Sequence, residues 1–216
     1  DYADTVLAVN LYDTLVYPKR GGPGVEPLLA TEWTVDGPTY TFKLRDGVKF
    51  QSGNTMTADD VVFSFNRTMA LGQGFSSLFA GRVEKVEAVD PLTVRFTLSE
   101  PYAPFLAALV RLAIVDQKTV MANKADGPHG EFGDYGEAWL SAHSAGTGAY
   151  MVESQNPQSE TVMVKFPDYF LGFAPEAPDR VRYRYGVEAS TVRALMSRGE
   201  HDIADLWLPP KVIRAM

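Results

Sequence analysis

The chain has 216 residues, 45% of them hydrophobic and 22% charged, so it can bury one large or two small cores and does not have the composition of a disordered protein. Its formal net charge is −7, which argues against a nucleic-acid-binding protein because a phosphate backbone requires a basic surface. It contains no cysteine, and this excludes disulfides, thiolate metal ligands and a cysteine nucleophile.

The first elements mix helix, loop and strand. Residues 5–15 carry apolar side chains at mixed spacing and predict a short helix that passes into a strand. Residues 18–24 are rich in proline and glycine, which predicts a loop and a candidate domain boundary.

A strand pair follows, with a turn at 36–38. Residues 40–45 alternate with period two, so Tyr40, Phe42 and Leu44 are predicted to be buried while Lys43 and Arg45 face solvent. Residues 48–50 predict one more short strand.

The clearest helix begins after Thr57. Thr57 is a good N-cap, and Asp60 stands at the capping-box position, where a carboxylate also favours the positive end of a helix. Ala58, Val61, Val62, Phe65 and Met69 predict one buried stripe.

The remaining elements alternate strand and helix. Their predicted ranges are a hairpin at 82–98, an apolar helix at 104–112, a surface loop at 127–136, strands at 161–166 and 180–185, a helix at 190–198 ended by Gly199, and a short buried strand at 201–205. Gly146 and Gly148 predict a tight turn with positive φ before a further strand. The order is that of a β-rich block inserted between two pieces of one lobe.

The sequence contains no pattern of residues that indicates a catalytic site. The three histidines, His129, His143 and His201, are far apart and lack metal-ligand spacing, so we interpret them as surface residues and expect no metal site and no cofactor. Residues 146–148 lack the rest of a phosphate-binding or dinucleotide motif.

Trp207 is the candidate ligand-binding residue, together with Leu206 and Leu208. It follows a predicted buried strand and precedes Pro209, which ends that strand, so a loop should emerge there at the sheet edge. A tryptophan at that position either walls an apolar ligand pocket or packs in the core.

Several stretches in order resemble the peptide- and nickel-binding family of extracytoplasmic solute receptors of ABC importers, known as family 5. They are residues 10–16 (NLYDTLV), 40–50 (YTFKLRDGVKF), 57–65 (TADDVVFSF), 89–94, 146–150 (GTGAY) and 199–204. The family usually has proline where Ala149 stands.

The resemblance implies a mixed α/β and α+β fold of the periplasmic-binding-protein type, class II, cluster C. Residues 1–18 and 146–216 would form part of the first ligand-facing lobe, and residues 19–145 an inserted β-rich subdomain. Because family members are about twice as long, we expect the chain to be truncated at both ends and the second lobe to be absent.

The implied function is capture of a solute, by default a dipeptide or oligopeptide, and its delivery to an ABC importer permease. The implied protein is a monomer that lies in the periplasm or is lipid-anchored at the cell surface, and it is not an enzyme. The alternatives are a receptor for a nickel complex, sugar or opine, an isolated protein-interaction module, and an enzyme of unknown type.

Overall fold

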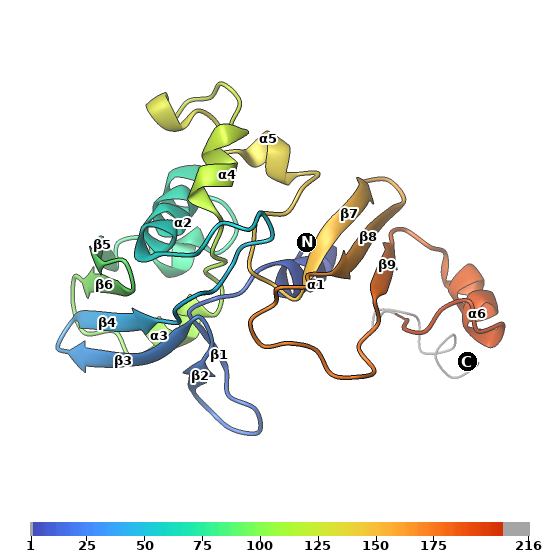
Figure 1. Cartoon of the computed structure of the whole chain (residues 1–216), viewed down its shortest axis with the longest axis horizontal. Coiled ribbons are helices and arrows are strands. Elements are labelled where there is room, and N and C mark those ends of the chain that lie inside the picture. Colours follow the sequence, from blue (N-terminus) through green and yellow to red (C-terminus); the bar gives the residue numbers. More distant parts are fainter. Residues whose placement is uncertain (1, 205–216) are drawn as a thin grey trace.

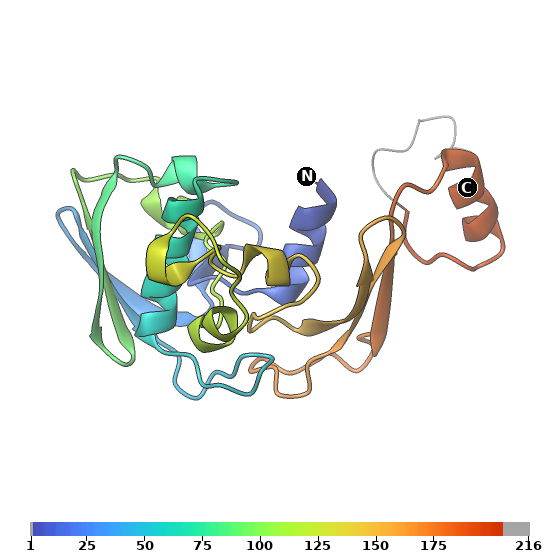
Figure 2. The same ribbon diagram turned by 90° about the horizontal axis from the view of Figure 1, so that it is seen from above.

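The structure is a computed structural model that describes residues 2–204. Two groups of elements lie side by side, and helix α1 (Tyr2–Leu11) stands between them in both views (Figures 1 and 2). We call the first group the β-rich unit (β1–β6 and α2–α5) and the second the flanking unit (α1, β7–β9 and α6). No described helix is long and apolar enough to cross a membrane.

A four-stranded antiparallel sheet forms the centre of the β-rich unit. Its strand order is β3 (Ala30–Asp36), β4 (Thr39–Leu44), β6 (Thr93–Leu98) and β5 (Val83–Asp90). The other elements are the hairpin β1 (Val16–Pro18) and β2 (Val25–Pro27), the helices α2 (Ala58–Leu71), α3 (Phe105–Leu109), α4 (Gln117–Ala122) and α5 (Glu137–Leu140), and the 3₁₀ turns η1 (Ser76–Leu78) and η2 (Gly130–Phe132).

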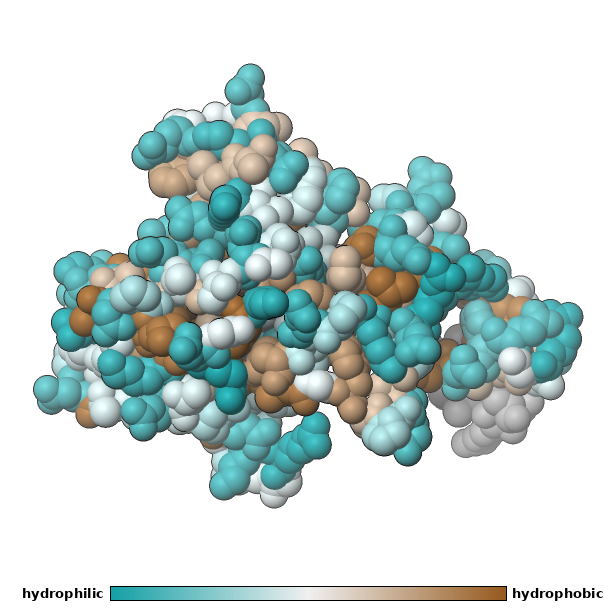
Figure 3. Space-filling model, viewed as in Figure 1, coloured by the Kyte–Doolittle hydropathy of each residue, from teal (hydrophilic) through white to brown (hydrophobic). Residues whose placement is uncertain are grey.

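The flanking unit is built on a three-stranded antiparallel sheet. The order is β7 (Tyr150–Asn156), β8 (Glu160–Lys165) and β9 (Arg180–Arg184), followed by helix α6 (Ala189–Ser197). The arginines of β9 point to solvent and pair with Glu153 and Glu160. This face of the molecule is largely hydrophilic over β9 and α6 (Figure 3).

Aromatic rings fill the core of the β-rich unit. Phe42 and Phe96 from adjacent strands are fully buried and meet edge to face, with ring centroids 5.9 Å apart. Phe65 of α2 meets Phe96 in the same way at 5.7 Å, so the helix closes one face of the sheet. The predicted face is confirmed, since Tyr40, Phe42 and Leu44 are all buried.

Helix α2 begins as predicted. The Asp60 carboxylate accepts hydrogen bonds from the Thr57 backbone N–H at 2.8 Å and from its hydroxyl at 3.2 Å. The helix is also buried on a second side that the single stripe did not predict, because Phe63 packs with Tyr135 of the 127–136 loop.

Three predictions need correction. Arg45 is half-buried, because its Nε donates to the Leu28 carbonyl at 3.3 Å and its guanidinium lies over the Phe170 ring. Residues 48–50 form only one bridge, between Lys49 and Thr55.

The third correction concerns residues 201–204, which lie in neither strand nor helix. Ile203 is 87% exposed, so the prediction of a buried strand is wrong for the part of it that the structure describes. That strand was inferred from local hydrophobicity, and a strand also needs a neighbour to pair with.

Candidate functional site

The two units meet where the chain leaves α1. The residues after α1 run against the segment 146–148, and the Gly148 N–H donates to the Leu11 carbonyl at 3.1 Å. A Cβ at Gly146 would lie 2.1 Å from the Leu11 carbonyl oxygen, and one at Gly148 would lie 2.4 Å from the Leu11 carbonyl carbon. Neither glycine has a positive φ, so the predicted reason for them was wrong. They are glycines because two backbones cross in contact.

Gln51 ties this crossing to the β-rich unit. Its backbone N–H donates to the Gly146 carbonyl at 2.9 Å, and its side-chain Nε2 donates to the carbonyls of Leu11 at 2.9 Å and Tyr150 at 2.7 Å. One amide group therefore holds the end of α1 to the start of β7. The side-chain Oε1 is buried and has no protein partner.

Asp13 and Thr147 form a buried pair at the same crossing. The Thr147 hydroxyl donates to the Asp13 Oδ2 at 2.9 Å, and the two residues are 0% and 7% exposed, respectively. Burial raises the pKa of Asp13 to about 6, although the Thr147 hydrogen bond opposes the rise. Leu11–Asp13, Gln51 and 146–150 are together called the junction below.

Two tyrosines, Tyr12 within the junction and Tyr169 near Asp13, are themselves partly or fully removed from water. Burial raises the pKa of Tyr169, and the nearby charges of Asp13 and Tyr17 raise it further. Burial likewise raises the pKa of Tyr12, opposed by a hydrogen bond with the Ala145 backbone and by the charge of Arg67. Asp13 is itself buried, and the loss of contact with water explains why its charged form is disfavoured.

A second buried carboxylate, Asp116, lies beside a surface hollow of the β-rich unit. Its Oδ2 accepts from the hydroxyls of Ser52 at 2.6 Å and Thr119 at 2.5 Å and from the Asn54 amide at 2.8 Å. Burial alone would raise the pKa of Asp116, but these bonds and the Thr119 N–H lower it overall. The hollow is lined by Asn54, Thr55, Thr57, Asp59, Asp60, Asp116, Gln117, Lys118 and Met121.

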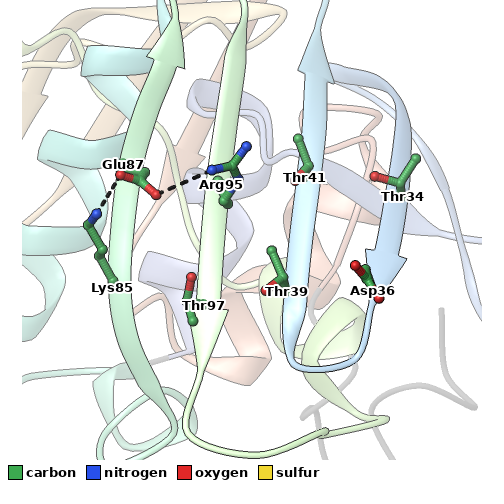
Figure 4. A pocket seen from close by; sticks show the side chains of 8 residues that line it. All are labelled: Thr34, Asp36, Thr39, Thr41, Lys85, Glu87, Arg95 and Thr97. Carbon is green, nitrogen blue, oxygen red and sulfur yellow. Dashed lines mark hydrogen bonds and ion pairs between the residues drawn. The ribbon is translucent and has the colours of Figure 1, made fainter.

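Another hollow lies on the outer face of the four-stranded sheet. Figure 4 shows its threonines, and Glu87 of β5 paired with Lys85 at 2.5 Å and with Arg95 of β6 at 3.7 Å. The charged side chains are satisfied by one another, and threonine is common on the solvated face of a strand. This arrangement is that of a solvated sheet face and offers no reactive group.

The histidines do not come together with other ligands. Within residues 2–204 there is no group of three or more His, Asp or Glu side chains that could hold a metal ion. His143 stacks on Trp139 with ring centroids 4.5 Å apart, and His129 packs against Tyr135. These contacts are structural.

Trp207, Leu206 and Leu208 lie outside the described residues, so their role stays a prediction. The sequence argument did not single out Asp13, Gln51 or Thr147. A signal for them was present, because Asp13 and Thr147 belong to two of the separate stretches that carry the family resemblance. Those stretches are 134 residues apart in the chain and in contact in the fold.

Residues 24–215 match the family model of bacterial extracellular solute-binding proteins, family 5 Middle. The chain is 34% identical to the probable D,D-dipeptide-binding periplasmic protein of Escherichia coli K12, over 100% of this chain and 41% of the relative.

Two of the similar solved structures hold a bound solute. The first is a periplasmic binding protein of Helicobacter pylori in complex with the peptide STSA, with TM-score 0.72 and 32% identity over 92% of this chain and 41% of that one. The second is a binding protein of A. tumefaciens R10 in complex with agropinic acid, with TM-score 0.80 and 26% identity over 98% and 40%. The chain thus spans about two fifths of the length of the proteins that it matches.

Proposed function

Because this chain belongs to family 5 of the bacterial extracellular solute-binding proteins, we propose that it is part of a receptor that captures a peptide and delivers it to an ABC importer permease. One observation carries the choice of peptide: the whole chain aligns with a relative described as dipeptide-binding. The similar structure that holds the peptide STSA supports the same choice. The family and its relatives are binding proteins, so the proposed role is capture without chemical change of the solute.

The proposed organisation is close to the two units of the fold and differs from them at β1 (Val16–Pro18), which packs with the β-rich unit. Residues 1–18 and 146–216 contribute to a ligand-facing lobe, and residues 19–145 form a subdomain inserted into it. Separate hydrophobic clusters support this division, since Leu7, Leu11, Tyr150 and Met163 pack together in the flanking unit apart from the aromatic core of the sheet. A second lobe would close over the solute about a hinge.

The junction would serve this function by fixing the orientation of the flanking unit relative to the β-rich unit. Gln51 and the glycine crossing hold β7 and the β-rich unit at one angle, so both present a fixed surface to the solute. We further propose that the receptor is a monomer outside the cytoplasm, in the periplasm or anchored by lipid at the cell surface, and that Trp207 with Leu206 and Leu208 lines the solute pocket.

Calorimetric titration with a panel of dipeptides to tetrapeptides tests the proposal. The titration should compare this chain with a polypeptide of the relatives' full length, because one lobe cannot bury 70–90% of a small ligand. We expect the longer protein to bind a peptide at micromolar or lower concentration and this chain to bind none.

Two outcomes would contradict the proposal. Micromolar binding by this chain alone would refute the need for a second lobe. A longer protein that ignores peptides but binds agropinic acid would support the opine receptor, which is the second candidate because of the similar structure that holds this compound.

A further inference from the structure

Asp13 is a buried carboxyl group with few hydrogen-bond donors. The only donor to its carboxylate among the described residues is the Thr147 hydroxyl, whereas Asp116, buried to a similar degree, accepts from four groups. Burial without compensating donors disfavours the charged form. The two aspartates therefore respond to protons in opposite ways, and only Asp13 lies where the two units meet.

Among the residues that the structure describes, no cation pairs with the carboxylate of Asp13. The charge of Asp13 acts on Tyr169 from the 166–179 loop, on which Tyr17 from β1 also acts, and Tyr12 is next to Asp13 in the chain. The charge of Arg67 from α2 acts on Tyr12, and its Nε is bound to the Tyr135 carbonyl at 2.9 Å. Lys49 from the adjacent turn pairs with Asp168 at 3.2 Å.

The backbone around Asp13 is the backbone that connects the units. The Ile114 N–H donates to the Asp13 carbonyl at 3.1 Å, and the Gly148 N–H donates to the carbonyl of Leu11, two residues before Asp13. A change in the charge of Asp13 thus acts on hydrogen bonds that join residues 11–13 to two other segments of the chain, at Ile114 and at Gly148.

We propose that Asp13 is a pH-sensitive latch, whose protonation tightens the contact between the β-rich unit and the flanking unit and whose ionisation loosens it. The geometry that carries the proposal is the buried Asp13–Thr147 pair inside the glycine crossing. The latch does not depend on the identity of the solute.

The direction follows from proton linkage. The pKa of Asp13 is about 6 in the folded chain and about 3.8 when exposed, so between these values the folded state binds more protons. The latch is fully stable below about pH 4, weakens as the pH rises towards 6, and stays weak above that. A shift of about two units corresponds to at most about a 100-fold change in the equilibrium between closed and open junction.

The test measures the titration of the Asp13 carboxyl by carbon NMR in the wild-type chain, and hydrogen exchange of the Gly148 and Gln51 amides from pH 4 to 8. After correction for intrinsic exchange, we expect protection of both amides to fall 10- to 100-fold as the pH rises from about 4 to about 6, and to stay low above pH 6. In Asp13→Asn the fall should vanish. Asp46→Asn, which removes an exposed aspartate charge, should keep the wild-type profile.

A carboxyl of Asp13 that titrates near pH 4 overturns the proposal, and this measurement needs no variant. Equal pH dependence of the two amides in wild type and Asp13→Asn also overturns it. Exchange in β4 and β6 separates a local latch from global unfolding. Amides in these strands should keep their protection across the same pH range, and a parallel loss there would refute a local latch.

Discussion

The two units of the chain differ in how completely each encloses its own core. Counted over the described residues, the main cluster of the β-rich unit has 22 buried residues, enough to pack a sheet against helices, whereas that of the flanking unit has four. Burial of apolar area is the dominant favourable term in folding, so the first unit is held by its interior and the second depends on the junction. We therefore interpret the β-rich unit as the support, against which the flanking unit is positioned by Gln51, Asp13 and the glycine crossing.

The largest expected effect comes from emptying the β-rich core. Phe42 is fully buried between Trp33 and Phe96, so Phe42→Ala should cost about 3–5 kcal/mol of unfolding free energy. Met163→Ala in the flanking core is the matched change and should cost less, about 2 kcal/mol. Denaturant melts measure both, and a smaller loss for Phe42 than for Met163 would reverse the comparison.

The next effect concerns the crossing itself. Gly148→Ala should cost about 3 kcal/mol, because the new methyl group would meet the backbone of residues 10–12, which cannot move without shifting α1. Gly22→Ala is the control, since its Cβ would meet nothing within 4 Å, and it should change stability by less than about 0.5 kcal/mol. Thermal melts of the two variants should therefore separate clearly; equal melting temperatures would mean that the junction adapts.

The third prediction concerns how the stability of the β-rich unit depends on pH, and the variant that tests it is Asp116→Asn. The pKa of Asp116 is lowered in the folded chain, so its contribution is present above the unfolded value near 3.8 and is lost as the pH falls through the folded value. At pH 7 the variant should lose about 1.5–3 kcal/mol, the range for hydrogen bonds to a charged group. Chemical melts from pH 7 down to 3 should show the difference from wild type shrinking with acid; a difference that grows would contradict the lowered pKa.

The smallest effect is expected at the edge of the flanking unit. Ile203 is 87% exposed, so Ile203→Ser should change the stability of this chain by less than about 0.5 kcal/mol. Val192→Ser, within α6 and buried, is the contrasting change and should cost more. If Ile203→Ser lowers the free energy of unfolding by more than about 1 kcal/mol in a denaturant melt, Ile203 is buried as the sequence predicts.

Local chemistry determined much of this protein from its sequence. The alternation in 40–45, the cap at Thr57 and the glycine after α6 each act over a few residues, and the structure has the corresponding strand, helix start and helix end. The family and its fold were also predicted, because ordered motifs along the whole chain are specific even where each one alone is weak.

The contacts between these motifs become visible once the chain is folded. Gly146 and Gly148 are required by the backbone of a helix more than 130 residues away, and the buried Asp13 meets Thr147 across the same distance. Contacts between remote segments leave no periodic pattern in the sequence. The sequence also does not reveal that the carboxylate of Asp13 has one hydrogen-bond donor and that of Asp116 has four. Burial and the number of donors set the opposite pKa shifts of Asp13 and Asp116, and both quantities exist only once the chain has folded.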